Sequence, residues 1–231
     1  MSNEQRFADL QGPFNGIDHH QSDNQTEATC FIMLHGWGAD GRDLIDLVHP
    51  LRAFVPQLSL FCPHAPDICS ANPFGRQWFA LTETLYKDPA SAYGEMDRAA
   101  ALVEQAAMAL SEQMGIEPHR IFIGGFSQGG MMSLHLAQRA KSQMAGYASI
   151  AGALLANQNI TPAPDSKAPI FLAHGERDEV VPFGAMARAN QMLLDAGYDC
   201  QTLARPIMGH SIDAETVNAL GHFMATELAT D

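Results

Sequence analysis

The sequence has few cysteines, few basic residues and no long hydrophobic run. It contains four cysteines in 231 residues, and none of them forms a C-x-x-C pair. This spacing argues against a disulfide framework and against a structural zinc site. Free thiols are typical of a reducing compartment, so we expect a cytoplasmic protein.

Acidic residues outnumber basic ones by 26 to 13, which gives a formal net charge of −13. An acidic surface repels phosphate backbones and anionic headgroups, so we expect no nucleic-acid partner. No run of about 18 apolar residues is present and the N-terminus lacks the apolar core of a signal peptide, so we expect no membrane insertion. The hydrophobic content of 46% suffices for one core, which predicts a single domain over residues 1–231.

From residue 28 onward, short apolar segments alternate with amphipathic ones. The segments that resemble buried strands are Thr29–Leu34, Leu58–Cys62, Arg120–Gly124, Tyr147–Ala151, Pro169–Ala173 and Cys200–Ala204. The segments with helical spacing are Asp43–Phe54, Glu95–Met114, Ser127–Ala140, Ala185–Ala196 and Ile212–Leu228. This alternation predicts an α/β fold with a mainly parallel central sheet and helices on both faces. Ligands of such folds lie at the carboxyl ends of the strands.

Two segments depart from this pattern. Residues 17–27 are polar and predict an exposed turn after a first strand near Phe7–Leu10. His19 and His20 are adjacent there and could bind a metal, but an exposed loop pair is the simpler interpretation, and we expect no metal site. Residues 64–92 are rich in proline and aromatic residues and predict a long irregular loop, a kind of segment that is often functional.

Ser127 is the candidate nucleophile. It is the centre of Gly125-Phe126-Ser127-Gln128-Gly129, a G-x-S-x-G motif between a predicted strand and a predicted helix. In that context the motif forms a sharp turn that exposes the serine hydroxyl, and only small residues fit two positions before and after it. The alternative is a glycine-rich turn with a helix-capping serine. The flanking strand and helix favour the nucleophile.

A serine nucleophile needs a base and a group that orients the base. Of the ten histidines, His210 combines a late position, a preceding strand and a glycine neighbour. Asp178 follows the strand at residues 169–173 and precedes two apolar residues, which indicates a carboxylate that turns inward. The chain order Ser, Asp, His is the order of the α/β-hydrolase fold.

The tetrahedral intermediate of acyl transfer needs N–H donors for its oxyanion. We expect one from the backbone of Gln128, directly after the nucleophile. The segment His35-Gly36-Trp37-Gly38 follows an early strand, and its glycines would let the Trp37 N–H turn inward as the second donor. A simple turn with a buried tryptophan is the alternative.

Five segments together resemble the phospholipase/carboxylesterase family, which includes the acyl-protein thioesterases. They are LHGWGADGRDLI, PHAPDICSANPFGRQWF, IFIGGFSQGG, LAHGERDEVVP and GHSI, and the resemblance runs from about Cys30 to the end. It implies an α/β-hydrolase that cleaves carboxylic esters, lysophospholipids or acyl thioesters without a metal or other cofactor. The family's triad falls on Ser127, Asp178 and His210, and its oxyanion donors fall on Trp37 and Gln128.

The GRQWF segment and the proline-rich loop resemble the bacterial branch of the family. This resemblance makes a small-ester or acyl-ester substrate the expectation over protein depalmitoylation. Within the loop, Phe74, Trp78 and Phe79 are candidates for the apolar surface of an acyl pocket. The alternative is that these aromatic residues pack on the core and anchor the loop.

The sequence also allows two other hypotheses about function. One is a different enzyme of the same fold, such as a peptidase or a hydrolase of lactone or C–C bonds. The other is a catalytically silent α/β-hydrolase that acts as a ligand-binding or interaction protein, although such chains usually lose a triad member. An apolar patch beside the loop could also form a homodimer.

Overall fold

The computed structural model describes residues 17–20, 22, 28–139, 142–155 and 168–229, which are organised around one twisted sheet. The strand order is β1-β3-β2-β6-β7-β8-β9. Strand β1 is antiparallel to β3 and all other neighbouring pairs are parallel. The strands are β1 (Ile17–His20), β2 (Thr29–Leu34), β3 (Leu58–Pro63), β6 (Ile121–Phe126), β7 (Gly146–Ile150), β8 (Ile170–Gly175) and β9 (Cys200–Arg205).

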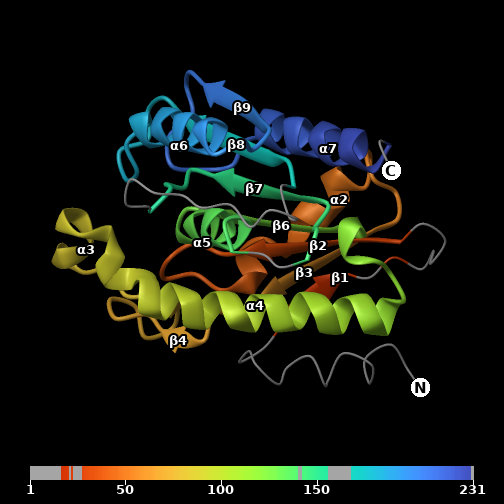
Figure 1. Ribbon diagram of the computed structural model, residues 1–231, viewed down its shortest axis with the longest axis horizontal. Helices are drawn as coiled ribbons and strands as arrows, with labels where there is room; N and C mark the ends of the chain where they lie inside the picture. The colour runs from red at the N-terminus through yellow and green to blue at the C-terminus, as the bar shows by residue number, and fades with distance from the viewer. Residues whose placement is uncertain (1–16, 21, 23–27, 140–141, 156–167, 230–231) are drawn as a thin grey trace.

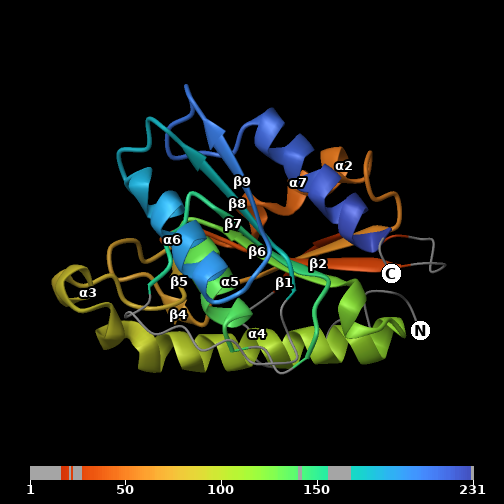
Figure 2. The ribbon, with the colours of Figure 1, turned by 45° about the horizontal axis from the view of Figure 1, so that its top comes forward.

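Helices cover both faces of this sheet. Figure 2 shows α2 and α7 on one face and α4, α5 and α6 on the other, and Figure 1 shows how α4 runs along the whole sheet. The α-helices are α2 (Val48–Leu51), α3 (Glu83–Lys87), α4 (Tyr93–Met114), α5 (Gln128–Ala137), α6 (Gly184–Asp195) and α7 (Ala214–Leu228). Short 3-10 turns occur at Gly41–Asp43, Ile45–Leu47, Pro89–Ala92 and Pro118–Arg120. The predicted α/β fold with a mainly parallel sheet is therefore confirmed.

Strand β2 shows why the central segments are continuously apolar. Cys30, Ile32 and Leu34 belong to the core under α4 and α6, whereas Phe31 and Met33 belong to the core under α2 and α7. Successive side chains of a strand point to opposite faces, and here both faces are covered. A strand buried on both sides has no position at which a polar side chain would meet water.

Three expectations about local structure were wrong in part. Residues 17–20 form β1 instead of an exposed turn, because their backbone pairs with β3. The helix expected over residues 43–54 is reduced to two 3-10 turns and α2, and Pro50 inside it lacks the N–H that a longer α-helix needs. The expected loop at 64–92 contains a small two-stranded sheet, β4 (Asp67–Ile68) with β5 (Arg76–Gln77), and also α3. The strand expected near Phe7–Leu10 lies outside the described residues.

Candidate active site

Ser127 stands at the turn between β6 and α5 in a backbone conformation that side chains rarely adopt. Its φ is 54° and its ψ is −116°. Two backbone hydrogen bonds hold the turn: Ser127 N–H donates to the carbonyl of Ile150 at 2.8 Å, and the Ser127 carbonyl accepts from Met131 N–H at 3.0 Å. Strain of this kind persists only where the surrounding structure imposes it, and it clusters at functional sites.

The glycines of the motif are required by close backbone contacts. A Cβ at Gly125 would lie 2.2 Å from the carbonyl carbon of Gly129. A Cβ at Gly129 would lie 2.0 Å from the carbonyl oxygen of Leu34 in β2. The turn is therefore as tight as the motif predicts, and it packs directly on the neighbouring strand.

The structure brings the three residues of the predicted triad into one hydrogen-bonded chain. His210 lies in the loop between β9 and α7, and its Nε2 is 2.9 Å from Ser127 Oγ. Its Nδ1 is 2.7 Å from Oδ2 of Asp178, which lies in the loop after β8. A carboxylate only accepts, so Nδ1 carries the proton and Nε2 is free to accept the serine hydroxyl. The Phe126 ring packs on the imidazole, with centroids 4.8 Å apart.

The side chain of Asp178 is fully buried and remains a carboxylate. Burial alone would raise its pKa, but the hydrogen bonds from His210, Val181 and Val180 outweigh burial and lower the pKa overall. The two valine N–H groups each donate to Oδ1 at 2.8 Å. A negative charge is thereby held beside the imidazole, where it would stabilise the protonated form.

Gly175 and His174, at the end of β8, shape the surroundings of Asp178, and the sequence analysis did not predict a role for either. A Cβ at Gly175 would lie 2.1 Å from the carbonyl oxygen of Met208, so only glycine lets the His210 loop pack against the end of β8. His174 lies in β8 with its Nε2 3.2 Å from Asp178 Oδ2. The His174-Gly175 pair directly before the acidic loop was the feature of the sequence that could have indicated both roles.

The loop after β2 lies against Ser127, as expected for an oxyanion-binding loop. A Cβ at Gly36 would be 3.5 Å from Ser127 Cβ. Gln128 is the first residue of α5, so its N–H has no partner within the helix. No hydrogen bond from the Trp37 N–H to another described residue is present. Gln128 directly follows the serine in the chain and Trp37 directly follows Gly36, so both stay candidate oxyanion donors.

The proline-rich loop holds the Trp37 loop in place. Gly38 N–H donates to the Arg76 carbonyl at 2.9 Å, and Arg76 N–H donates to the Ala39 carbonyl at 2.8 Å. The Trp37 indole donates to Gln77 Oε1 at 3.1 Å. The long loop therefore contributes to the site by fixing the backbone that carries a candidate oxyanion donor.

His35 supports the same loop as a neutral imidazole. Burial lowers its pKa to about 4, and the hydrogen bond to Gly36 offsets only part of that effect. Its Nε2 accepts from Ala65 N–H at 3.0 Å, so Nδ1 carries the proton and donates to the Gly36 carbonyl at 2.7 Å. This side chain links the backbone beside Ser127 to the start of the proline-rich loop.

Comparison with known proteins fits this geometry. The family model described as phospholipase/carboxylesterase matches residues 16–228 of the chain. The chain belongs to the phospholipase/carboxylesterase family. Its relatives are named as hydrolases, so the chain is an enzyme of the hydrolase class and the family expected from the sequence is confirmed.

Relatives in this family are acyl-protein thioesterases and carboxylesterases. The chain is 30% identical over 211 residues to acyl-protein thioesterase 1 of Neurospora crassa, covering 85% of the chain and 86% of the relative. It is 31% identical over 209 residues to acyl-protein thioesterase 1 of Emericella nidulans, covering 84% and 87%. The crystal structure of esterase PE8 superposes with a TM-score of 0.81 at 29% identity, over 90% of this chain and 97% of that one. The expected bacterial branch is not confirmed, since these two thioesterases are fungal.

The three aromatic residues that the sequence suggested for an acyl pocket differ in their exposure to solvent. They are Phe74, Trp78 and Phe79. Trp78 and Phe79 are 0% exposed, and they belong to the core under α4. The Gln128 side chain clamps this pair: its Oε1 accepts from Trp78 N–H at 2.9 Å and its Nε2 donates to the Phe79 carbonyl at 2.7 Å. Phe74 is 92% exposed. The burial of Trp78 and Phe79 supports an anchoring role, and contact of the three with substrate stays a prediction.

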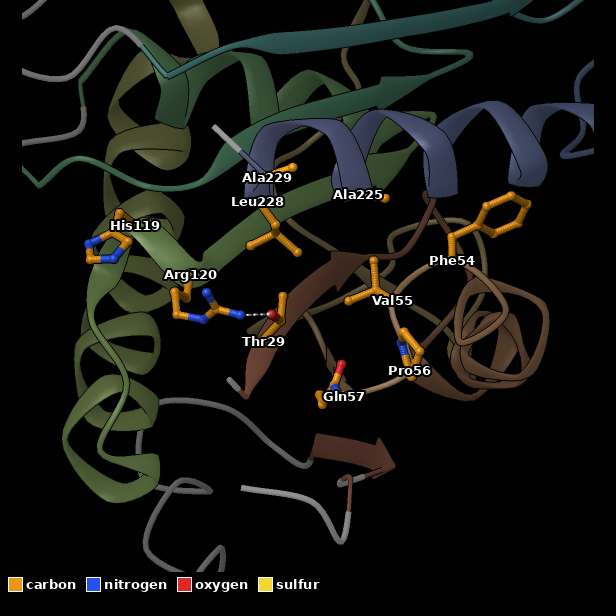
Figure 3. Close-up of a pocket in the computed structure, with 10 residues that line it drawn as sticks. All are labelled: Thr29, Phe54, Val55, Pro56, Gln57, His119, Arg120, Ala225, Leu228 and Ala229. Carbon is orange, nitrogen blue, oxygen red and sulfur yellow. Dashed lines mark hydrogen bonds between the residues drawn. The ribbon is translucent and has the colours of Figure 1, made fainter. Parts of the chain in front are cut away.

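A pocket of about 510 Å³ lies at the opposite edge of the sheet, at the amino ends of β2 and β6 (Figure 3). The Arg120 guanidinium in its lining donates to the Ala28 carbonyl at 2.9 Å and to Thr29 Oγ1, also in the lining, at 3.1 Å. The other lining residues include Phe54, Val55 and Leu228. This lining holds no serine or cysteine, so the pocket does not compete with Ser127 as a hydrolase site.

The described residues offer no metal site. Among them, no group of three or more His, Cys, Asp or Glu side chains could hold an ion. No helix in the described part of the chain is both long and apolar enough to cross a membrane.

Proposed function

We propose that this chain is a serine hydrolase of carboxylic esters and acyl thioesters in which Ser127, His210 and Asp178 act as the catalytic triad. The proposal rests on one observation, the continuous chain of hydrogen bonds from Ser127 Oγ through His210 to Asp178. The strained turn at Ser127 and the family of the chain support it independently.

Each group has one task in this mechanism. His210 Nε2 takes the Ser127 proton as Oγ attacks the acyl carbonyl carbon, and Asp178 holds the imidazole in the required tautomer and stabilises its charge. The N–H groups of Trp37 and Gln128 bind the oxyanion. His210 then returns its proton to the departing alcohol or thiol.

The acyl-enzyme is released by a water molecule. His210 removes a proton from the water, whose oxygen attacks the acyl carbonyl, and the proton passes to Ser127 Oγ as the carboxylic acid leaves. The mechanism needs a neutral imidazole at His210, so we expect ester hydrolysis to cease in acidic solution. No step uses a cofactor.

The names of the relatives support esters and thioesters as the substrate class of this proposal. Relatives named acyl-protein thioesterase and carboxylesterase share 28–31% identity with the chain, which supports ester and thioester substrates alike. A series of p-nitrophenyl esters of increasing chain length, with a lysophospholipid and an acyl thioester in parallel, assigns the preference.

The first prediction tests the nucleophile. Ser127→Ala should remove nearly all turnover of a short-chain p-nitrophenyl ester, by about 10⁴-fold or more, because no other group can form the acyl-enzyme. Wild-type protein should gain one fluorophosphonate adduct by intact mass, and Ser127→Ala should gain none. Full activity in the variant contradicts the proposal. A wild-type chain with neither adduct nor turnover favours the alternative of a silent binding protein.

We also propose a cytoplasmic location and keep the homodimer as a proposal. All four cysteines are free thiols, which supports a reducing compartment. Ile68 and Phe74 are 63% and 92% exposed on and beside the small sheet, and they supply apolar surface for a second copy. Sedimentation equilibrium measures the mass in solution.

A further inference from the structure

A second histidine lies beside the carboxylate of Asp178, and the mechanism above gives it no task. The His174 side chain is 1% exposed, and its Nε2 is 3.2 Å from Asp178 Oδ2. The same nitrogen is 2.9 Å from the carbonyl oxygen of Val181. The Phe183 ring packs on the imidazole, with centroids 6.1 Å apart. A histidine whose ring nitrogen faces two oxygens at the centre of a candidate site needs a physical explanation.

The proton of His174 can be assigned from its partners. The carbonyl of Val181 and the carboxylate of Asp178 are acceptors only, so a lone pair on Nε2 would face two oxygens and find no donor. Nε2 therefore carries a hydrogen in either charge state. It donates to the Val181 carbonyl and directs positive charge toward Oδ2.

The groups around the Asp178 carboxylate show what His174 adds. Oδ1 accepts from the N–H groups of Val180 and Val181, and Oδ2 accepts from His210 Nδ1. His174 Nε2 lies 3.2 Å from Oδ2, and its N–H donates to the carbonyl of Val181, whose own N–H donates to Oδ1. His174 therefore contacts Oδ2 directly and also contacts the Val181 residue that donates to Oδ1, and these contacts help to fix the plane of the carboxylate.

We propose that His174 is a positioning residue of the triad, which holds the Asp178 carboxylate toward His210 and shares the negative charge of Oδ2 with it. This inference rests on the proposed function, because it assigns the task of a residue that acts through Asp178. Sharing that charge weakens the stabilisation of protonated His210. His174 thus competes with His210 for the charge of Oδ2.

The groups that titrate around this corner are few. Facing Asp178 are His174 from β8 and His210 from the loop before α7, and no lysine or arginine in the described residues pairs with it. Facing His210 are Asp178, Ser127 and the uncharged Phe126 ring. A shift in the acid limb of the rate profile after a change at residue 174 therefore reports on the Asp178–His210 pair.

The test compares substitutions that keep or remove the donor. His174→Gln places an amide N–H near the Nε2 position, whereas His174→Met has a similar length without a donor and His174→Asn ends short of that position. We expect both donor-deficient variants to lose about tenfold or more in kcat per active site, with the acid limb of kcat/KM raised by about 0.5 pH unit. His174→Gln should stay within about threefold of wild type in kcat.

Fluorophosphonate labelling gives the concentration of active sites. Rates are divided by that concentration, so that a loss of folded protein does not lower the measured kcat. His135→Met is the matched control, because His135 is also buried and its Nε2 is 2.7 Å from Asp97 Oδ1, between α5 and α4. It should change thermal stability but leave kcat per site and the acid limb as in wild type.

Each outcome separates this inference from the proposed function. If the wild type labels and turns over, but the donor-deficient variants lose only active sites and keep kcat and the acid limb, His174 is merely structural and the inference is overturned. An acid limb that stays or falls in those variants also overturns it. A wild type that neither labels nor turns over removes the proposed function and this inference with it.

Discussion

Ser127 has a φ of 54°, and a non-glycine residue in such a region is destabilised by about 1–3 kcal/mol. The cost is local, because it arises from the contact of its own Cβ with the adjacent backbone. The conformation orients Oγ toward His210, at the end of a strand that is otherwise regular. Activity and stability therefore make opposite demands on this one position.

The second prediction isolates that strain. Ser127→Gly and Ser127→Ala both lack the hydroxyl and should both be inactive, but only glycine relieves the strained backbone. We expect Ser127→Gly to exceed Ser127→Ala by about 1 kcal/mol in free energy of unfolding. Urea denaturation followed by fluorescence measures the difference, and equal stabilities would show that the turn is not strained.

Elements meet at this site through backbone contacts that leave no room for side chains. The end of β8 touches the loop before α7 at Gly175, and the turn after β6 touches β2 at Gly129. Arg177 N–H also donates to the Met208 carbonyl at 3.1 Å. The position of His210 relative to Asp178 is set by this docking of one loop on the end of a neighbouring strand.

The third prediction concerns Gly175→Ala. Its Cβ would lie 2.1 Å from the Met208 carbonyl oxygen, so the His210 loop must move and kcat/KM should fall by about 100-fold. Gly184→Ala is the matched control, because a Cβ at this first residue of α6 meets nothing within 4 Å. Steady-state ester hydrolysis of both variants tests this, and equal rates in the two would contradict it.

The glycine-rich motif and the order of the triad residues could be predicted because they depend on short segments. The G-x-S-x-G motif predicts a tight turn, and the backbones of Gly125 and Gly129 lie close to each other as expected. The role of Gln77 and of the Gln128 side chain could not be predicted, since each acts on backbone or side chains at least seven residues away in sequence. Strand β1 was missed for the same reason, because it is defined by its pairing with β3.

At the scale of the whole molecule, two apolar cores enclose the sheet and contain a few buried polar side chains. His35 and His135 are buried and desolvation is the first cause that lowers the pKa of each. Unfolding exposes both imidazoles to water and restores their ordinary pKa. The unfolded chain therefore binds more protons than the folded chain in mildly acidic solution, and acid favours unfolding.

The fourth prediction follows from the sign of that linkage. The pKa of His35 falls from 6.5 to about 4 on folding, so its contribution to stability is complete above 6.5 and is lost as the pH falls toward 4. The loss amounts to about 3 kcal/mol. His35→Gln, which keeps an acceptor for Ala65 N–H, should show a shallower decline of the free energy of unfolding over this range. Denaturant titrations of both proteins at several pH values measure it, and parallel curves would contradict the assignment.

The sequence by itself determined the alternation of strands and helices, the tight turn at Ser127 and the order of Ser127, Asp178 and His210 along the chain. These depend on side-chain periodicity and on local backbone geometry, which a short segment specifies alone. Only the tertiary structure decided that His210 meets Ser127 across 83 residues, that β5 supports the Trp37 loop and that His174 lies against Asp178. Such contacts depend on the strand order, which places the ends of distant segments side by side, and no single segment carries that information.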